Sequence, residues 1–379
     1  MSANGNGMAQ RLAWLGILVP ALCVSPMAMA EWELNLREGV TDISRTVFDI
    51  HMTLFWICVV IGAGVFSVML YSIINHRKSK GAVAAQFHES TLVEILWTVI
   101  PTMILVVMAI PATLAFIEIE DNSASDMSVQ VIGYQWKWQY KYLDEELDFF
   151  SNLDAASRDQ IKADPTGVDN YLLEVDNRLV IPAGKKVRFL ISANDVIHSW
   201  WVPDFGWKQD AIPGFVNEAW TRVDEPGVYR GQCTELCGID HGFMPIVVEV
   251  KPQAEYDAWV AEQKSALVAA AASGDREWAM DELMEKGEEV YMRACVACHQ
   301  ANGQGIPPAF PPIAGGPIAT GPIEGHLDQA MNGVPGTAMQ AFAAQLNDVE
   351  LAAVVTYQRN AFGNDMGDLV QPADVKAAR

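Results

Sequence analysis

The sequence predicts a multidomain membrane protein with three successive folds: a two-helix transmembrane hairpin, an all-β sandwich and an all-α C-terminal domain. Two apolar stretches, Met52 to Ile74 and Ile95 to Ile117, are each long enough to cross a bilayer as a helix. Short alternating runs separated by turn residues follow them and indicate strands. Beyond residue 275 a Cys-x-x-Cys-His motif lies between segments with helical patterns.

The first 30 residues have the pattern of a secretory signal. Arg11 precedes the apolar stretch Leu12 to Val24, and the segment ends in Ala28-Met-Ala30. We therefore expect cleavage before Glu31. An uncleaved membrane anchor is the alternative, but the apolar stretch is short for a span.

The loop between the two predicted spans is basic, with the sequence His76-Arg77-Lys78-Ser-Lys80. The positive-inside rule assigns this loop to the cytoplasm. The mature N-terminus and everything after Asp121 are then expected on the periplasmic side of a bacterial inner membrane. Glu94 lies at the cytoplasmic start of the second span, where a carboxylate also suits the helix dipole.

Strand patterns follow the second span. Ser128 to Tyr140 alternates with period two, and Val180 to Ala193, Trp220 to Val223 and Pro245 to Val250 add further runs. Residues 144–170 are acidic and polar, which predicts a surface excursion. The four alternating runs suit the strands of a small sandwich.

Five side chains in this region form a ligand set for copper: His198, Cys233, Cys237, His241 and Met244. Thiolate and thioether ligands select copper from harder cations. A disulfide or a zinc site explains part of the set, but zinc has no use for the Met. Two cysteines that bridge two copper ions, with one His on each ion, would give every side chain a role. His198 must come from a separate strand end, as in a cupredoxin-like sandwich with its metal at one pole.

The sequence Cys295-Val-Ala-Cys298-His299 is the signature of covalent c-type haem attachment, with two thioether bonds and a His on the iron. A redox dithiol or half of a zinc site is the alternative. Trp278 to Arg293 predicts a helix before the motif, and Asp348 to Asn360 predicts a final helix.

Met331 and Met339 compete for the sixth position on the haem iron. Met339 lies in an irregular stretch, Gly333 to Phe342, before the last helix, whereas Met331 is expected to end a helix. We assign Met339 because of its position in this irregular stretch. A Met opposite a His raises the potential of a c-type haem.

From about residue 45 to residue 251 the chain resembles subunit II of the haem-copper cytochrome c oxidases. The resembling segments are Lys208-Gln-Asp-Ala-Ile-Pro213-Gly214, Gly231-Gln-Cys233 and Phe243-Met-Pro-Ile-Val-Val-Glu249. The resemblance implies the dinuclear copper centre called CuA.

The resemblance also implies a role for each copper ligand. Cys233 and Cys237 would bridge the ions, His198 and His241 would be terminal, and Met244 would be axial on one ion.

Further roles rest on the same resemblance. The second copper would take the backbone carbonyl of Glu235, whose side chain would reach a magnesium ion shared with the catalytic subunit. Trp136 matches the tryptophan through which electrons enter CuA, although the family commonly has His at Tyr134 and an aromatic residue at Lys137. Glu94 matches the residue at the mouth of a proton path.

The C-terminal region resembles a class I cytochrome c, in which a proline carbonyl fixes the ring of the axial His. Pro311 lies where that proline is expected.

The predicted domain boundaries follow from these patterns. We expect a signal peptide at 1–30, the N-terminal segment and hairpin at 31–121, the CuA domain at 122–252, a short helix and Ala-rich linker at 253–274, and the cytochrome c domain at 275–379.

The composition is acidic, with 47 Asp and Glu against 25 Lys and Arg and a formal net charge of -22. Such a surface argues against nucleic-acid binding and attracts basic proteins.

The expected function is an electron relay from a soluble cytochrome c, through the haem c and CuA, to a haem-copper catalytic subunit I that reduces oxygen to water with proton translocation. Subunit I, subunit III and membrane lipid are the expected partners. A CuA-type nitric oxide reductase subunit and a membrane-tethered electron carrier without an oxidase core are the alternatives.

Overall fold

The computed structural model describes residues 35–161, 166–274 and 276–379. The predicted signal segment 1–30, with Arg11 and the cleavage site before Glu31, lies outside the described residues.

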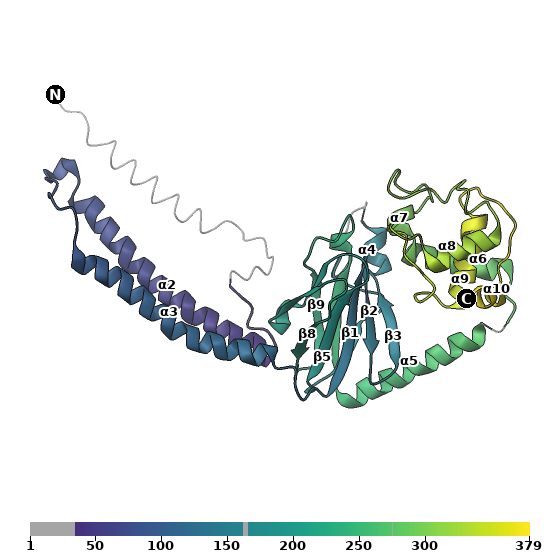
Figure 1. Ribbon diagram of the computed structural model, residues 1–379, viewed down its shortest axis with the longest axis horizontal. Helices are drawn as coiled ribbons and strands as arrows, with labels where there is room; N and C mark the ends of the chain where they lie inside the picture. The colour runs from purple at the N-terminus through teal and green to yellow at the C-terminus, as the bar shows by residue number, and fades with distance from the viewer. Residues whose placement is uncertain (1–34, 162–165, 275) are drawn as a thin grey trace, which may run out of the picture. The chain divides into compact units, whose positions relative to one another are not determined.

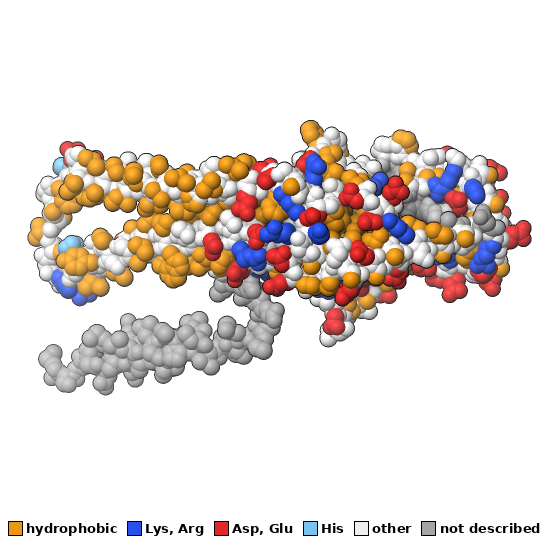
Figure 2. Space-filling model, turned by 90° about the horizontal axis from the view of Figure 1, so that it is seen from below, with side chains coloured by type: hydrophobic (Ala, Val, Ile, Leu, Met, Phe, Trp, Pro, Cys, Tyr) orange, Lys and Arg blue, Asp and Glu red, His pale blue; other side chains and the backbone are white. Residues whose placement is uncertain are grey.

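Two long helices, α2 (Asp42–Asn75) and α3 (Thr91–Glu120), lie side by side and form the predicted hairpin (Figure 1). Both are long and apolar enough to cross a membrane. Figure 2 shows apolar side chains along their length, as expected for helices that face lipid. The basic loop between them contains a single 3₁₀ turn, η1 (Lys78–Lys80). The prediction of two spans is confirmed, and each helix extends beyond its apolar stretch.

The β-sandwich consists of two five-stranded sheets (Figure 1). The first has the order β3 (Leu147–Ser151), β2 (Lys137–Tyr142), β1 (Met127–Tyr134), β5 (Val187–Ala193) and β8 (Asn217–Thr221). The second has the order β4 (Leu179–Pro182), β10 (Pro245–Lys251), β9 (Gly227–Cys233), β6 (His198–Trp201) and β7 (Lys208–Ala211). Fully buried aromatic side chains, among them Trp138, Trp200 and Phe189, fill the core.

The single strand predicted over Ser128 to Tyr140 is in fact a hairpin of β1 and β2, with Gln135 and Trp136 at its turn. The buried positions change parity across that turn: Val129 and Val131 face the core before it, and Trp138 and Tyr140 after it. Because side chains alternate strictly along one strand, this change required a turn.

The acidic segment 144–170 was expected to be a surface excursion, and this is wrong for its first part. Leu147–Ser151 forms β3, which pairs with β2, and Leu147 and Ser151 are buried. Asp148 is the exposed position of this strand, so its carboxylate points outward, away from the buried Leu147 and Ser151. A short helix, α4 (Ala155–Asp159), follows, and residues 162–165 lie outside the described part of the chain.

The C-terminal part is helical, as predicted. Its helices are α5 (Gln253–Ser273), α6 (Met280–Ala294), α7 (Val296–His299), α8 (Ile323–Asn332), α9 (Asp348–Asn360) and α10 (Pro372–Ala378). The Ala-rich stretch expected to be a connector continues the helix α5 to Ser273, because Ala has the highest helix propensity.

Helices α6 and α9 cross closely and carry the core of the haem-motif domain. A Cβ atom on Gly287 would lie 2.2 Å from the carbonyl oxygen of Ala353, so only glycine permits this approach. Val290, Leu351 and Val355 are fully buried in the core of this domain. The crossing fixes the helix that ends directly before Cys295.

Candidate functional site

The structure brings the five predicted copper ligands together at one end of the sandwich. The Cys237 Sγ lies 3.5 Å from the His241 Nδ1 and 3.5 Å from the Met244 Sδ. It lies 3.9 Å from the Cys233 Sγ, which in turn is 4.0 Å from the His198 Nδ1. All five donor atoms therefore face a common centre.

The strand order explains this convergence. His198 begins β6 and Cys233 ends β9, and the two strands are antiparallel with Trp200 opposite Cys233. The start of one strand and the end of the other therefore lie at the same end of the sheet. The β9–β10 loop supplies the remaining ligands and ends at Met244, directly before β10.

Glu235 contributes its backbone to this cluster. Its carbonyl oxygen lies 3.4 Å from the Cys233 Sγ, while its side chain is exposed. The loop thus turns the peptide carbonyl toward the sulfur atoms and the carboxylate away from them.

The ring of His198 is held from several sides. Its Nε2 donates a hydrogen bond to the Asp195 Oδ1 at 2.9 Å. The unprotonated Nδ1 therefore faces Cys233 and is the ring atom that could bind a metal. Trp138 contacts the ring edge-on, and a Cβ on Gly133 would lie 2.7 Å from it. A carboxylate behind a ligating His fixes its tautomer and increases its basicity.

The charge balance around His198 favours a basic imidazole. Burial acts to lower the pKa of His198, but the hydrogen bonds and charge interactions with Asp195 and Cys233 together outweigh it, so the pKa is raised.

The two cysteines form a coupled pair of thiols. The hydrogen bond from the Cys237 thiol lowers the pKa of Cys233 to about 4, and the same bond raises the pKa of Cys237. The metal-free pair therefore keeps one proton near neutral pH. A metal ion would displace that proton, as thiolate coordination requires.

The donor chemistry of this cluster suits copper. Both cysteines are free, and their sulfur atoms are much farther apart than the about 2.0 Å of a disulfide. The ligand atoms of His198, Cys233 and Cys237 all lie within 4.8 Å of one another, close enough to bind a metal. Met244 adds a thioether, which zinc sites do not use.

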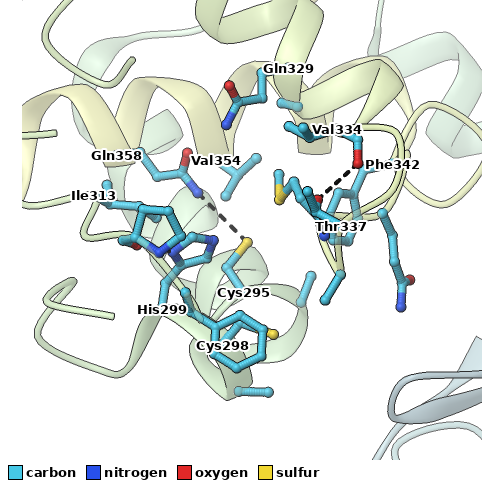
Figure 3. Close-up of a pocket in the computed structure, with 18 of the residues that line it drawn as sticks. Cys295, Cys298, His299, Ile313, Gln329, Val334, Thr337, Phe342, Val354 and Gln358 are labelled. Atoms are coloured by element: carbon cyan, nitrogen blue, oxygen red, sulfur yellow. Dashed lines mark hydrogen bonds between the residues drawn. The ribbon is translucent and has the colours of Figure 1, made fainter. Parts of the chain in front are cut away.

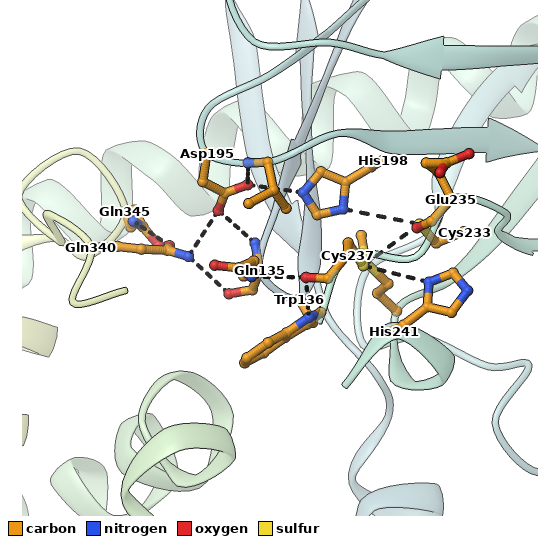
Figure 4. A network of polar contacts seen from close by, with 12 residues as sticks. Gln135, Trp136, Asp195, His198, Cys233, Glu235, Cys237, His241, Gln340 and Gln345 are labelled. Atoms are coloured by element: carbon orange, nitrogen blue, oxygen red, sulfur yellow. Dashed lines mark hydrogen bonds and ion pairs between the residues drawn. The ribbon is translucent and has the colours of Figure 1, made fainter. Parts of the chain in front are cut away.

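The β1–β2 turn lies against the copper ligands (Figure 4). The Gln135 Nε2 and the Trp136 Nε1 both donate to the carbonyl oxygen of Cys237, at 2.8 Å and 3.1 Å. Asp195 accepts from the backbone N–H of Gln135 at 2.7 Å. One carboxylate therefore anchors both a copper-ligand ring and the turn that carries Trp136.

The two departures from the oxidase pattern are both placed in this region. The Tyr134 hydroxyl donates to the Gln139 Oε1 at 3.2 Å, and its ring packs against Phe150. The Lys137 Nζ lies 5.1 Å from the centre of the same Phe150 ring, a cation–π contact.

Cys295, Cys298 and His299 line a largely apolar cavity (Figure 3). The His299 Nδ1 donates to the carbonyl oxygen of Pro311 at 2.9 Å, so the predicted proline contact is confirmed. That bond leaves Nε2 free for iron, and burial lowers the pKa of His299, which keeps the imidazole neutral. The cavity, the two thiols and the oriented His fit a covalent c-type haem.

Met339 also lines this cavity, whereas Met331 does not contribute to its wall. Met331 lies near the end of α8 and is buried in the core of the domain. The structure therefore places Met339, among the two candidates, where a haem iron could be reached.

Glu94 lies in the first turn of α3, as expected from the sequence. Its side chain is exposed at the end of the apolar helix. The described residues bring no other acidic or basic side chain into contact with it.

Sequence reasoning missed Gln135 and Asp195 at the copper cluster and Gln358 at the haem cavity. Asp195 stands three residues before His198 in the loop that leads into β6, a spacing that could have indicated a carboxylate behind the ring. Gln358 lies on the buried side of α9, where a polar side chain is unusual. This could have indicated a specific role for Gln358.

Three family models match successive parts of the chain. The transmembrane domain of cytochrome c oxidase subunit II matches residues 29–114, and its periplasmic domain matches residues 127–251. The subunit III family of cbb3-type cytochrome c oxidase matches residues 282–357. These models imply a CuA copper site and a haem c, in the same regions as the two clusters.

Relatives of known name match the first two parts. A protein named "Probable cytochrome c oxidase subunit 2" from Rickettsia bellii is 42% identical over 233 residues, covering 61% of this chain and 84% of the relative. A cytochrome c oxidase subunit 2 from Arabidopsis thaliana is 36% identical over 243 residues, covering 63% and 93%. The solved periplasmic domain of cytochrome oxidase subunit II from Bradyrhizobium japonicum is 39% identical, with a TM-score of 0.34, covering 38% of this chain and 96% of that domain.

Proposed function

Because the chain belongs to the cytochrome c oxidase subunit 2 family, we propose that it carries electrons through a haem c and a dinuclear CuA centre to a haem-copper catalytic subunit. The observation that carries this proposal is the convergence of five soft donor side chains on one point at the end of the sandwich. Copper bound there supplies reversible one-electron transfer, while the protein orients the ligands and tunes the potential.

The ligand geometry supports one role for each copper residue. Cys233 and Cys237 have the central positions and would be shared by the two ions, while His198 and His241 would each serve one ion and Met244 would add a thioether to one of them. The backbone carbonyl of Glu235 serves the other ion, since it already points at the Cys233 sulfur.

Trp136 is the entry point for electrons into this centre. Its indole N–H donates directly to the carbonyl of Cys237, which gives a short path from the ring to a bridging ligand. Removal of that N–H weakens the path without removing a ligand.

Cys295 and Cys298 would hold the haem c covalently, and His299 and Met339 would bind its iron. The bond from His299 to Pro311 presents Nε2 to the iron, and Met339 lies on the wall of the same cavity. A His–Met pair favours a high potential, which suits an acceptor for a soluble cytochrome c.

Membership of the family supports two further roles. The exposed carboxylate of Glu235 would hold a magnesium ion shared with the catalytic subunit. Glu94, at the start of an apolar helix, lies at the entrance of a proton path, since ionisable groups at the edge of the membrane commonly serve transport.

The cellular setting follows from the hairpin and the charge. The basic loop supports a periplasmic position of the copper and haem domains at a bacterial inner membrane. The net charge of -22 favours a basic cytochrome c as donor. Subunit I, subunit III and membrane lipid complete the assembly that reduces oxygen with proton translocation.

Turnover of the purified complex with reduced cytochrome c and oxygen tests this proposal. We expect the complex to consume oxygen only when its spectrum shows both the near-infrared band of the copper centre and the bands of the c-haem. Turnover of nitric oxide in preference to oxygen would show a reductase instead, and a chain that purifies without a haem-bearing membrane partner would indicate a tethered carrier.

A further inference from the structure

His326 and Gln358 form a buried polar pair in the wall of the haem cavity. His326 comes from α8 and Gln358 from α9, and the two side chains are only 5% and 7% exposed. The His326 Nε2 lies 2.8 Å from the Gln358 Oε1. The sequence alone suggested no role for this histidine.

The pair is unusual for its position. Neighbouring wall residues such as Leu351, Val354 and Ala330 are apolar, so an apolar pair would avoid the cost of burying polar groups. Buried polar pairs that persist in an apolar wall commonly fix a specific geometry. The question is which group this pair orients.

Gln358 makes its second contact with a haem-attachment cysteine. Its Nε2 lies 3.6 Å from the Cys295 Sγ (Figure 3), so the amide nitrogen faces the sulfur and the amide oxygen faces His326. Because that oxygen can only accept, the His326 Nε2 must carry the proton. Burial lowers the pKa of His326 to about 4, so a neutral ring with its single proton at Nε2 is the stable form.

The two thioether cysteines differ in this respect. Cys295 receives the N–H of Gln358, whereas the Cys298 sulfur has no hydrogen-bond donor within the described ranges. Cys298 therefore serves as an internal control for the effect of this hydrogen bond on Cys295.

We propose that His326 and Gln358 are positioning residues that hold the Cys295 sulfur for its thioether bond to haem. The inference rests on the proposed haem c. In that bond the Cys295 thiol adds across a haem vinyl group: a carbon–sulfur bond forms, and the thiol proton moves to the other vinyl carbon. The addition needs no net oxidant or reductant. His326 locks the amide, and the amide N–H orients the sulfur toward the vinyl carbon.

Four variants of the full chain, matured with haem in the cell, test this proposal. His326→Leu and Gln358→Leu remove the pair, whereas His326→Gln keeps an N–H donor near the position of Nε2. Gln358→Glu keeps the side-chain shape and the bond to His326 but has no N–H for Cys295. The purified chains are denatured, their free thiols are alkylated with iodoacetamide, and peptides from 295–299 are analysed by mass spectrometry.

We expect His326→Leu, Gln358→Leu and Gln358→Glu to yield chains with haem on Cys298 and an alkylated Cys295, at least several-fold more than the wild type. The alkaline pyridine spectrum of these chains should shift to longer wavelength, because one vinyl group stays conjugated. His326→Gln should keep the haem attached to both cysteines, as in the wild type.

Complete attachment at both cysteines in all variants would overturn the proposal, even if the melting temperature falls, because the pair would then serve only stability. Equal loss at Cys295 and Cys298 would overturn it as well. Absence of covalent haem from the wild type would instead refute the proposed haem c, so the two failures are distinguishable.

Discussion

The copper cluster and the haem cavity solve the same problem in opposite ways. At the copper end of the sandwich each donor atom already lies 3.4 to 4.0 Å from a neighbouring donor atom, and the cluster is held by strand ends and by Asp195. In the C-terminal domain the attachment residues surround a cavity, and the ring of His299 is held by a hydrogen bond to the backbone carbonyl of Pro311.

This difference follows from the size of what is bound. A copper pair is small, so the protein must bring its ligands close together, and the hydrogen bond between the two adjacent cysteines appears as the opposed pKa shifts of Cys233 and Cys237. A haem is large and apolar, so burial of its surface and covalent attachment supply most of the binding, and few side chains need precise positions. Changes at the copper ligands should therefore be the more damaging.

The largest expected effect is loss of the copper centre in Cys233→Ser. A hydroxyl cannot replace a bridging thiolate, so the near-infrared copper band and oxygen turnover should both disappear. The c-haem spectrum should remain, because its residues belong to a separate domain. Cys58→Ser is the matched control, since Cys58 is exposed on α2 and should change neither signal. A copper band that survives in Cys233→Ser would contradict the ligand assignment.

Met339→Leu should have the next largest effect, confined to the haem. Loss of the thioether removes the ligand that raises the potential, so the reduction potential should fall by on the order of 0.1 V or more. Met331→Leu is the control: it exchanges similar volumes in the core and should cost less than about 1.5 kcal/mol of stability with the potential unchanged. Potentiometric titration distinguishes the two, and a larger shift in Met331→Leu would reverse the assignment.

Asp195→Asn should weaken the copper centre without abolishing it. The change removes the carboxylate behind His198, and such outer contacts typically contribute about 10- to 100-fold to metal affinity. Competition with a copper chelator measures this loss. Asp224→Asn, at an exposed position in the same sandwich, should leave the affinity unchanged. Equal affinities in both variants would show that the copper ligands are held by the strands alone.

Trp136→Phe should have the smallest effect on structure. It keeps an aromatic ring but loses the N–H bond to Cys237, a contact that contributes about 1 kcal/mol to the turn. We expect a normal copper spectrum and a several-fold slower reduction of copper, measured by stopped flow. An unchanged rate would place electron entry elsewhere.

The sequence predicted the elements and the ligands better than it predicted what holds the ligands. The spans, the helix Asp348–Asn360 and the copper loop could be found because each depends on local spacing, although Asp348–Asn360 is followed by α10 and is not the final helix expected from the sequence. The β1–β2 hairpin was missed because aromatic residues continue across its turn, although the parity of buried positions changes there.

The supporting contacts could not be predicted because they join distant segments. Gln135 reaches the Cys237 carbonyl across 102 positions, and Gln358 reaches Cys295 across 63. A polar residue on the buried side of α9 marks Gln358 as unusual, but nothing in the local sequence of either glutamine identifies the group that it contacts. Only the pairing of β1 with β5, in parallel, brings the Gln135 turn beside Asp195.

The central claim is that electrons pass from the haem to the copper centre within one chain. Rapid reduction of the haem in the intact complex, followed by absorbance of the haem and of the near-infrared copper band, tests it most directly. In the wild type the haem should be reoxidised as the copper band disappears, and in Cys233→Ser the haem should stay reduced. Haem reoxidation at the wild-type rate in Cys233→Ser would contradict the relay.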